Sequence, residues 1–177
     1  MRVLLINPFY PISETPSPPL GLAYLAAALN EAGIEVKVLD LVVFPYSRAM
    51  LQQIIEEFEP HIAGLTAVTM TFDSAVSVVR DIKEIDQRIV TVMGGPHVTF
   101  CASSTLEMHP DLDIIVLGEG ERTIVDLSRA VERNRDWRQV EGIAFRSESG
   151  IARSPKRAPI ANLDELPDPA RGMLPLG

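Results

Sequence analysis

The stretch at residues 3–33, VLLINPFYPISETPSPPLGLAYLAAALNEAG, sets the pattern that decides the fold. Its first four residues are wholly apolar, and Asn7 and Pro8 end the run, as is typical of a short strand buried on both faces. A proline-rich loop follows at residues 10–19. Residues 20–32 are rich in alanine and leucine and close on Gly33, which predicts a helix with a glycine at its C-terminal end.

The same cycle of an apolar strand followed by an amphipathic helix then repeats along the chain. The further predicted strands are residues 35–39, 62–68, 89–93 and 113–117. Two further helices are predicted from about Ser47 to before Pro60 and from an N-cap at Asp73 onward. A weak helix is predicted over residues 102–108, and another helix near residues 121–132.

Strict alternation of strands and helices predicts an α/β fold with a five-stranded parallel sheet, helices on both faces and right-handed crossovers. We therefore expect a doubly wound, flavodoxin-like (Rossmann-like) domain with strand order 2-1-3-4-5. In such open sheets, ligands bind outside the carboxyl ends of the strands, near the point where the strand order reverses. The loops that follow the strands are therefore the places to look for a site.

The C-terminal part of the chain has a different pattern. Residues 142–156 alternate in polarity and carry Ser149-Gly150 at a turn position, which predicts a β-hairpin. Residues 161–177 hold three prolines and two glycines with little periodicity and are typical of a linker. We expect a core domain at residues 1–138, a hairpin and linker at 139–177, and a longer protein of which this is the front part.

Composition excludes several classes of partner. A formal net charge of −8 and a pI near 4.9 argue against a nucleic-acid contact, which needs many cations facing phosphates. The longest apolar runs are interrupted well before the roughly 20 residues of a membrane-spanning helix. The single cysteine, Cys101, cannot form an internal disulfide, and the N-terminus does not resemble a signal peptide. A reducing cytoplasm is the expected location.

The first loop lacks the signatures of common nucleotide sites. It contains neither GxGxxG nor GxxxxGK followed by Ser or Thr, so NAD and ATP are disfavoured. A phosphoacceptor receiver domain would need acidic Mg²⁺ ligands after the first and third strands, where the chain has Asn7-Pro8 and Thr66-Ala67 instead.

Small and hydroxylated residues gather after the third, fourth and fifth strands, at residues 66–71, 94–97 and 118–121. The paired glycines would allow a flat ligand to approach the backbone closely, although tight turns use glycine too. Threonines also favour strands, and glutamates also cap helix N-termini. His97 and Cys101 lie four residues apart, but a zinc site needs three or four ligands, so no metal site is predicted.

Three motifs occur together in the expected order, PPLGLAYLAAAL at residues 18–29, GGPHVT at 94–99 and DIIVLGEGERT at 113–123. With them, the chain resembles the N-terminal cobalamin (B12)-binding domain of cobalamin-dependent radical SAM enzymes, the class that includes anaerobic magnesium-protoporphyrin monomethyl ester cyclase. The resemblance covers nearly the whole chain. IANLDELPDPAR at 160–171 resembles the segment that leads into the radical SAM barrel.

The resemblance implies a corrinoid across the strand ends, with its nucleotide tail between the sheet and the helices. Residues 66–71 and 94–95 would flank the tail, while residues 8–10 and 118–121 would border the ring. The predicted cofactor-binding residues are Pro8, Phe9, Tyr10, Leu20, Gly21, Thr66, Val68, Thr69, Met70, Thr71, Gly94, Gly95, Pro96, His97, Gly118, Glu119, Gly120 and Glu121.

Two departures from related families limit what the chain can do. It lacks the Asp-x-His-x-x-Gly motif of methionine synthase and the mutases after the first strand, so that loop offers no histidine to cobalt. One cysteine cannot supply the CxxxCxxC triad of a 4Fe-4S cluster, so cluster and S-adenosylmethionine would belong to an absent downstream domain, and no catalytic residue is predicted here. Two alternatives stay open, a flavodoxin-like nucleotide-binding enzyme domain and a cofactor-free interaction domain.

Overall fold

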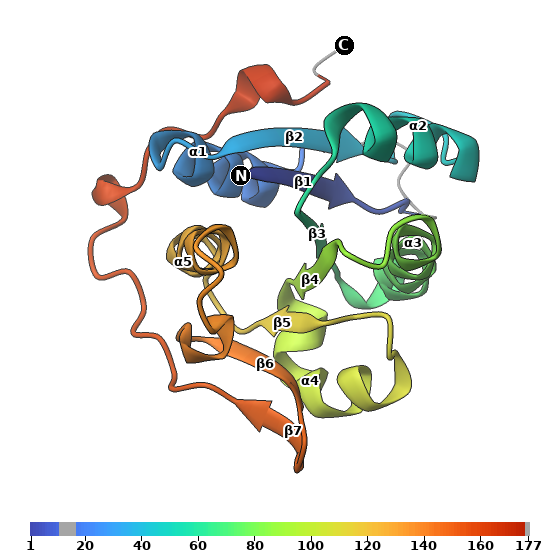
Figure 1. Cartoon of the computed structure of the whole chain (residues 1–177). Helices are drawn as coiled ribbons and strands as arrows, with labels where there is room; N and C mark the ends of the chain where they lie inside the picture. The colour runs from blue at the N-terminus through green and yellow to red at the C-terminus, as the bar shows by residue number, and fades with distance from the viewer. Residues whose placement is uncertain (11–16, 176–177) are drawn as a thin grey trace.

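Short apolar strands form the centre of the protein (Figure 1). The computed structural model describes residues 1–10 and 17–175. Within these residues, seven strands form one sheet in the order β2-β1-β3-β4-β5-β6-β7, and the first five are parallel, which confirms the predicted order. The strands are β1 (Arg2–Asn7), β2 (Glu35–Asp40), β3 (Ile62–Thr66), β4 (Val90–Gly94), β5 (Ile114–Val116), β6 (Ile143–Ser147) and β7 (Gly150–Arg153).

Helices cover both faces of this sheet, with α1 and α5 on one side and α2, α3 and α4 on the other (Figure 1). Their bounds are α1 (Leu20–Glu31), α2 (Arg48–Phe58), α3 (Phe72–Ile85), α4 (Pro96–Met108) and α5 (Glu121–Glu132). The core positions of strand β1 explain why its sequence is apolar from Val3 to Ile6. Leu4 and Ile6 belong to the core under α2, α3 and α4, whereas Val3 and Leu5 belong to the core under α1 and α5. Within residues 1–10 and 17–175, no helix has both the length and the apolar character that crossing a bilayer requires.

The start of α3 differs from the prediction. Asp73 is not the N-cap, because a 3-10 turn at Thr69–Thr71 leads directly into the helix and Thr71 takes the cap position. The Thr71 hydroxyl accepts a hydrogen bond from the Val68 N–H and donates one to the Val68 carbonyl, which closes the turn. Asp73 lies in the first helical turn, where its charge still complements the helix dipole.

The helix predicted weakly at residues 102–108 is longer and begins at Pro96. Proline suits the first position of a helix, because its missing N–H would have no helical partner there. The helix is bent at Cys101, whose backbone angles (φ −119°, ψ 31°) are not helical. The sequence pattern therefore showed only the segment after the bend.

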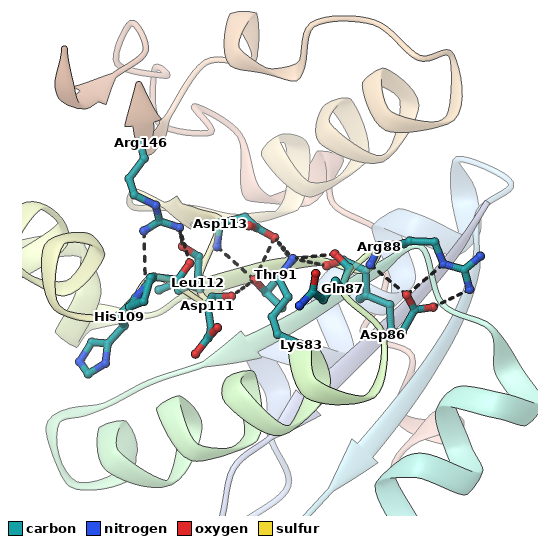
Figure 2. Close-up of polar contacts among 12 residues, drawn as sticks. Lys83, Asp86, Gln87, Arg88, Thr91, His109, Asp111, Leu112, Asp113 and Arg146 are labelled. Atoms are coloured by element: carbon teal, nitrogen blue, oxygen red, sulfur yellow. Dashed lines mark hydrogen bonds and ion pairs between the residues drawn. The ribbon is translucent and has the colours of Figure 1, made fainter. Parts of the chain in front are cut away.

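The predicted hairpin of β6 and β7 is confirmed, and it extends the main sheet because β6 pairs antiparallel with β5. The side chain of Arg146 on β6 fastens this addition to the rest of the fold (Figure 2). Its guanidinium donates hydrogen bonds to the carbonyls of Leu106 and Pro110, at 2.8 and 2.9 Å, and also to those of His109 and Leu112. One side chain thus provides hydrogen-bond donors for the backbone carbonyls at the end of α4 and in the loop before β5.

The segment after β7 returns along α5 towards α1, as the orange to red trace in Figure 1 shows. Arg157 pairs with Asp126 on α5 at 2.6 Å, and Ile160 is buried. Further on, the Ala170 N–H donates to the Ala23 carbonyl on α1 at 3.0 Å. The segment expected to be a linker is therefore attached to the α1 and α5 face at several points.

Candidate cofactor-binding site at the carboxyl edge of the sheet

A slot of about 290 Å³ opens at the carboxyl edge of the sheet, between the strands and helices α1 and α5. Its floor follows from the strand register, because Leu5 on β1, Gly64 on β3 and Val92 on β4 are paired neighbours in one row. The full lining is Leu5, Gly21, Leu22, Leu25, Gly64, Leu65, Thr66, Val92, Gly94, Gly95, Pro96, Val116, Gly118, Glu119, Gly120, Glu121 and Ile124. Apolar side chains and glycine backbone dominate, as in sites that hold flat organic ligands.

At two glycines of the slot, the packing of the protein does not require the absence of a side chain. A Cβ at Gly21 would have no atom within 4 Å, and a Cβ at Gly94 would have only Val116 Cβ, at 3.9 Å. Both backbones have φ angles that any residue can adopt. Because neither sterics nor conformation requires glycine at these positions, the space that their missing side chains leave is available to a ligand.

Gly95 is glycine for a different reason. Its φ is +101°, and a Cβ there would lie 2.6 Å from the Ala67 carbonyl oxygen and 2.9 Å from the Ala67 nitrogen. The turn after β4 therefore lies directly against the segment after β3, and the His97 N–H donates to the same Ala67 carbonyl at 3.2 Å. This close approach joins the two segments, residues 66–71 and 94–95, that were expected to flank the nucleotide tail.

The segment after β3 uses its hydroxyl groups locally. Thr69 Oγ1 lies 3.2 Å from His97 Nδ1, and the His97 ring is stacked obliquely on Phe72 with 4.3 Å between centroids. The Tyr10 hydroxyl lies 3.5 Å from the Met70 sulfur, which links the β1 loop to the same segment. The result is one continuous rim formed by the turns after β1, β3 and β4.

Exposed apolar side chains are frequent along the whole carboxyl edge, including this rim. Most of the large hydrophobic residues that the structure shows exposed lie on segments that follow the carboxyl end of a strand: Phe9, Leu20, Val43, Phe44, Val68, Met70 and Phe100. Phe100 on α4 is 87% exposed. Several exposed apolar side chains near a glycine-lined slot are typical of a surface that a ligand or another domain covers.

Half of the predicted cofactor-binding residues line the slot itself: Gly21, Thr66, Gly94, Gly95, Pro96, Gly118, Glu119, Gly120 and Glu121. The others lie outside its lining: Pro8, Phe9, Tyr10, Leu20, Val68, Thr69, Met70, Thr71 and His97. Thr71 is buried, and its hydroxyl closes the turn described above, so its position has a purely structural explanation. The part of the proline-rich loop at residues 11–16 lies outside the described residues.

Sequence reasoning missed eight slot residues, all of them inside strands or helices: Leu5, Leu22, Leu25, Gly64, Leu65, Val92, Val116 and Ile124. One of them carried a usable signal, because Gly64 interrupts the otherwise apolar third strand. Glycine inside a strand often marks a close approach of a ligand or of another backbone. A Cβ at Gly64 would lie 3.1 Å from the side chain of Leu5, which lies over it.

Metal-ligating side chains do not gather at this site. Among the residues that the structure describes, no group of three or more histidine, cysteine or acidic side chains could hold a metal ion. The Cys101 thiol donates to the His97 carbonyl at 2.9 Å, within its own helix. The chemistry of the slot is therefore that of an apolar pocket with a few polar groups at its mouth.

These features define an α/β domain with a candidate ligand slot at the carboxyl edge, between the sheet and helices α1 and α5. The family model described as the B12 binding domain matches residues 13–128, and the chain belongs to that family. It is a cobalamin-binding domain, related to the B12 domains of radical SAM methyltransferases and cyclases. The resemblance stated from the three loop motifs is thereby confirmed.

Two relatives match almost the whole chain. An uncharacterized methyltransferase of Pyrococcus horikoshii is 35% identical over 99% of this chain and 39% of its own length. The anaerobic magnesium-protoporphyrin IX monomethyl ester cyclase of Rubrivivax gelatinosus is 35% identical over 94% of this chain and 32% of its own. This chain therefore spans about a third of the length of these relatives.

Solved structures agree with the fold. The radical S-adenosylmethionine methyltransferase TsrM of Kitasatospora setae, solved with cobalamin and a 4Fe-4S cluster bound, superposes with a TM-score of 0.78 at 25% identity. The match covers 87% of this chain and 30% of that protein. The cobalamin-dependent S-adenosylmethionine radical enzyme OxsB gives the same TM-score, 0.78, at 23% identity, which supports the fold alone.

Proposed function

We propose that this chain is the cobalamin-binding module of a radical SAM enzyme of the methyltransferase or oxidative cyclase type, and that it presents the corrinoid at the carboxyl ends of its strands. The observation that carries the proposal is the slot at Gly21 and Gly94, where the absence of side chains serves no internal contact. A flat base at the end of the nucleotide tail suits a narrow apolar space of this kind.

The residues of the slot and those of the rim would hold different parts of such a cofactor. Leu5, Leu22 and Ile124 would exclude water from the tail, and Thr66 would offer a hydroxyl at the mouth. The exposed Phe9 and Met70 would lie beside the ring on the rim. When bound, cobalamin supplies the organometallic chemistry, and the protein supplies position and shielding.

The wider setting rests on the relatives. We place the boundary of the cobalamin-binding domain near residue 138, with the hairpin and linker at residues 139–177. A 4Fe-4S cluster and S-adenosylmethionine would be held by a radical SAM domain that follows this linker in the same polypeptide. The sequence from Ile160 to Arg171 supports this order because it resembles the segment that leads into such a domain. The β1 loop, which contains no histidine, would leave the lower face of cobalt without a ligand from that loop. A cytoplasmic location stays a prediction.

The substitution Gly21→Leu tests the slot directly. Leucine favours a helix over glycine by roughly 0.8 kcal/mol, so we expect the variant to be at least as stable as the wild type. Its side chain would fill the slot, and we expect hydroxocobalamin affinity, followed by the visible spectrum, to fall about 100-fold or more because the displaced tail loses its burial.

Two comparisons make this result specific. Gln53→Leu adds a leucine to an exposed position of α2, away from the slot, and we expect it to leave affinity unchanged. Cobinamide, which lacks the nucleotide tail, should bind wild type and Gly21→Leu equally. If Gly21→Leu binds cobalamin as tightly as the wild type, the tail does not enter this slot. Saturable binding of FMN instead of cobalamin would favour a nucleotide-binding enzyme domain, and binding of neither would favour an interaction domain.

A further inference from the structure

A second hollow, of about 500 Å³, adjoins the slot on the far side of the turn after β5. Gly118 and Glu119 line both spaces. The hollow is bounded by this turn, by the first turn of α5, and by the segment that leaves β7. Its lining is Thr99, Leu117, Gly118, Glu119, Arg122, Gly142, Arg153, Ser154, Lys156, Arg157, Ala158, Pro159 and Ile160.

Positive charge distinguishes this hollow from the rest of the molecule, which has a formal net charge of −8. Four of its described lining residues are cationic: Arg122, Arg153, Lys156 and Arg157. Among the same described residues, only Glu119 carries a carboxylate. A concave surface lined by one sign of charge concentrates ions of the other sign. The local charge is thus opposite to what the composition of the chain would suggest.

Two of the four cations are already paired and two are not. Arg157 lies 2.6 Å from Asp126, and Arg122 lies 3.0 Å from Glu165. Within residues 1–10 and 17–175, no ion pair joins Arg153 or Lys156 to a carboxylate. These two exposed side chains come from neighbouring positions around Ser154 and are available to a ligand.

The other polar groups of the wall have partners. Ser154 Oγ accepts the Ile143 N–H at 3.0 Å, and Thr99 Oγ1 accepts the Gly118 N–H at 3.3 Å. The carboxylate of Glu119 accepts the Ile160 N–H at 2.7 Å. A Cβ at Gly118 would have no atom within 4 Å, so the wall is bare backbone at the boundary with the slot.

We propose that this basic hollow binds a phosphate or carboxylate group of a small molecule. Arginine and lysine recognise such oxyanions by charge-assisted hydrogen bonds, and Arg153 and Lys156 are the two cations without a competing carboxylate. The oxyanion has two possible sources. It is either the phosphodiester of the nucleotide tail of cobalamin, which depends on the function proposed above, or the anionic group of a separate molecule held beside the cofactor, which does not.

Calorimetric titration of the chain with inorganic pyrophosphate at low ionic strength tests the site itself. We expect saturable binding that weakens with added salt, and about tenfold weaker binding by the double variant Arg153→Gln, Lys156→Gln, because each exposed charge contributes a few-fold. The matched control Arg80→Gln, Arg133→Gln removes two exposed arginines outside the lining, one on α3 and one at the C-terminal end of α5, and should bind as the wild type does. Equal binding by the two double variants, or no saturable binding by the wild type, would overturn the proposal.

Titration with hydroxocobalamin and cobinamide then distinguishes the sources. If the hollow holds the phosphodiester, the Arg153→Gln, Lys156→Gln variant should lose affinity for cobalamin and keep its affinity for cobinamide, which has no phosphate. If it holds a separate anion, the variant should bind both corrinoids as the wild type does while still losing pyrophosphate. A chain that binds no corrinoid would refute the proposed function, and the pyrophosphate result would still stand by itself.

Discussion

The two edges of the sheet are built on different principles. At the carboxyl edge, glycines leave a slot, and apolar side chains such as Phe9 and Met70 are exposed. At the amino ends of β4 and β5, polar groups are satisfied within the protein (Figure 2). There Lys83 Nζ lies 2.6 Å from the Asp113 carboxylate, which also accepts the N–H and hydroxyl of Thr91 at 2.9 and 3.1 Å.

This difference indicates that the carboxyl edge can bind a ligand, whereas the amino edge contributes to the stability of the fold. A larger hollow, of about 820 Å³, lies between α2 and the C-terminal end of α3 and reaches the amino edge at Arg2. Its charges are mostly paired with one another, as in Arg2 with Glu59 and Arg88 with Asp86. Paired charges leave a ligand little to bind, so the smaller slot at the other edge is the better candidate site.

The largest effect on stability is expected from a substitution at the carboxyl edge, where two turns are in close contact. Gly95→Ala should lower the free energy of unfolding by about 3 kcal/mol, because its Cβ would collide with the Ala67 backbone at a positive φ. Gly94→Ala, one residue earlier, should change it by about 0.5 kcal/mol or less, since its Cβ makes an ordinary contact. Urea denaturation measures both. Equal losses for the two variants would show that the turns after β3 and β4 are not in close contact.

A smaller effect is expected at the amino edge. Arg146→Met should cost about 2 kcal/mol in urea denaturation, because burying the carbonyls of Leu106 and Leu112 without their charged donor leaves them unsatisfied. Cobalamin affinity should stay unchanged, since the guanidinium is remote from the slot lining. Arg80→Met, at an exposed position of α3, is the control and should be nearly neutral. A change in affinity without a change in stability would contradict this division between the edges.

The smallest expected effect is on the pH dependence of thermal stability. Partial burial, together with the nearby N-terminal ammonium group, lowers the pKa of His61 just before β3, where its Nδ1 accepts the Arg2 N–H. The unfolded chain then binds the proton more readily than the folded one, so this contribution to stability is present above about pH 6.5 and is lost as pH falls below it. Because His61 is largely exposed, we expect a change in Tm of about 1 °C.

The His61→Gln variant separates this residue from the general acid sensitivity of the protein. Its Tm difference between pH 7.5 and pH 5.5 should be slightly smaller than that of the wild type. A larger difference in the variant would mean that the protonated form of His61 stabilises the folded state, contrary to the direction of its pKa shift.

The strands could be predicted because their signal is local. The apolar run from Val3 to Ile6 requires burial on both faces, and the structure places alternate residues in two separate cores. The helix starts were harder, because capping depends on the turn before the helix. Thr71 takes the position expected of Asp73, and Pro96 opens a helix where the pattern showed only a glycine turn.

The candidate site was predictable at its turns and not along its walls. Gly118 to Glu121 were found because glycine and charge interrupt an apolar pattern. Leu22, Val92 and Ile124 were not found, since an apolar residue that lines a slot has the same sequence signature as one that fills a core. The basic hollow was also missed, because Arg122 and Lys156 come together only when the segment after β7 folds back.

By itself, the sequence determined the alternation of strands and helices, because periodicity and turn residues act over a few positions. The general rules for such alternating chains then predicted the parallel strand order and the edge at which ligands would bind. Only the tertiary structure decided that β6 joins the sheet, that Arg146 bonds to four carbonyls, and that bare glycines open a slot under α1 and α5. Each of these depends on segments far apart in the chain, and their distance in space is set by the crossovers rather than by neighbouring residues.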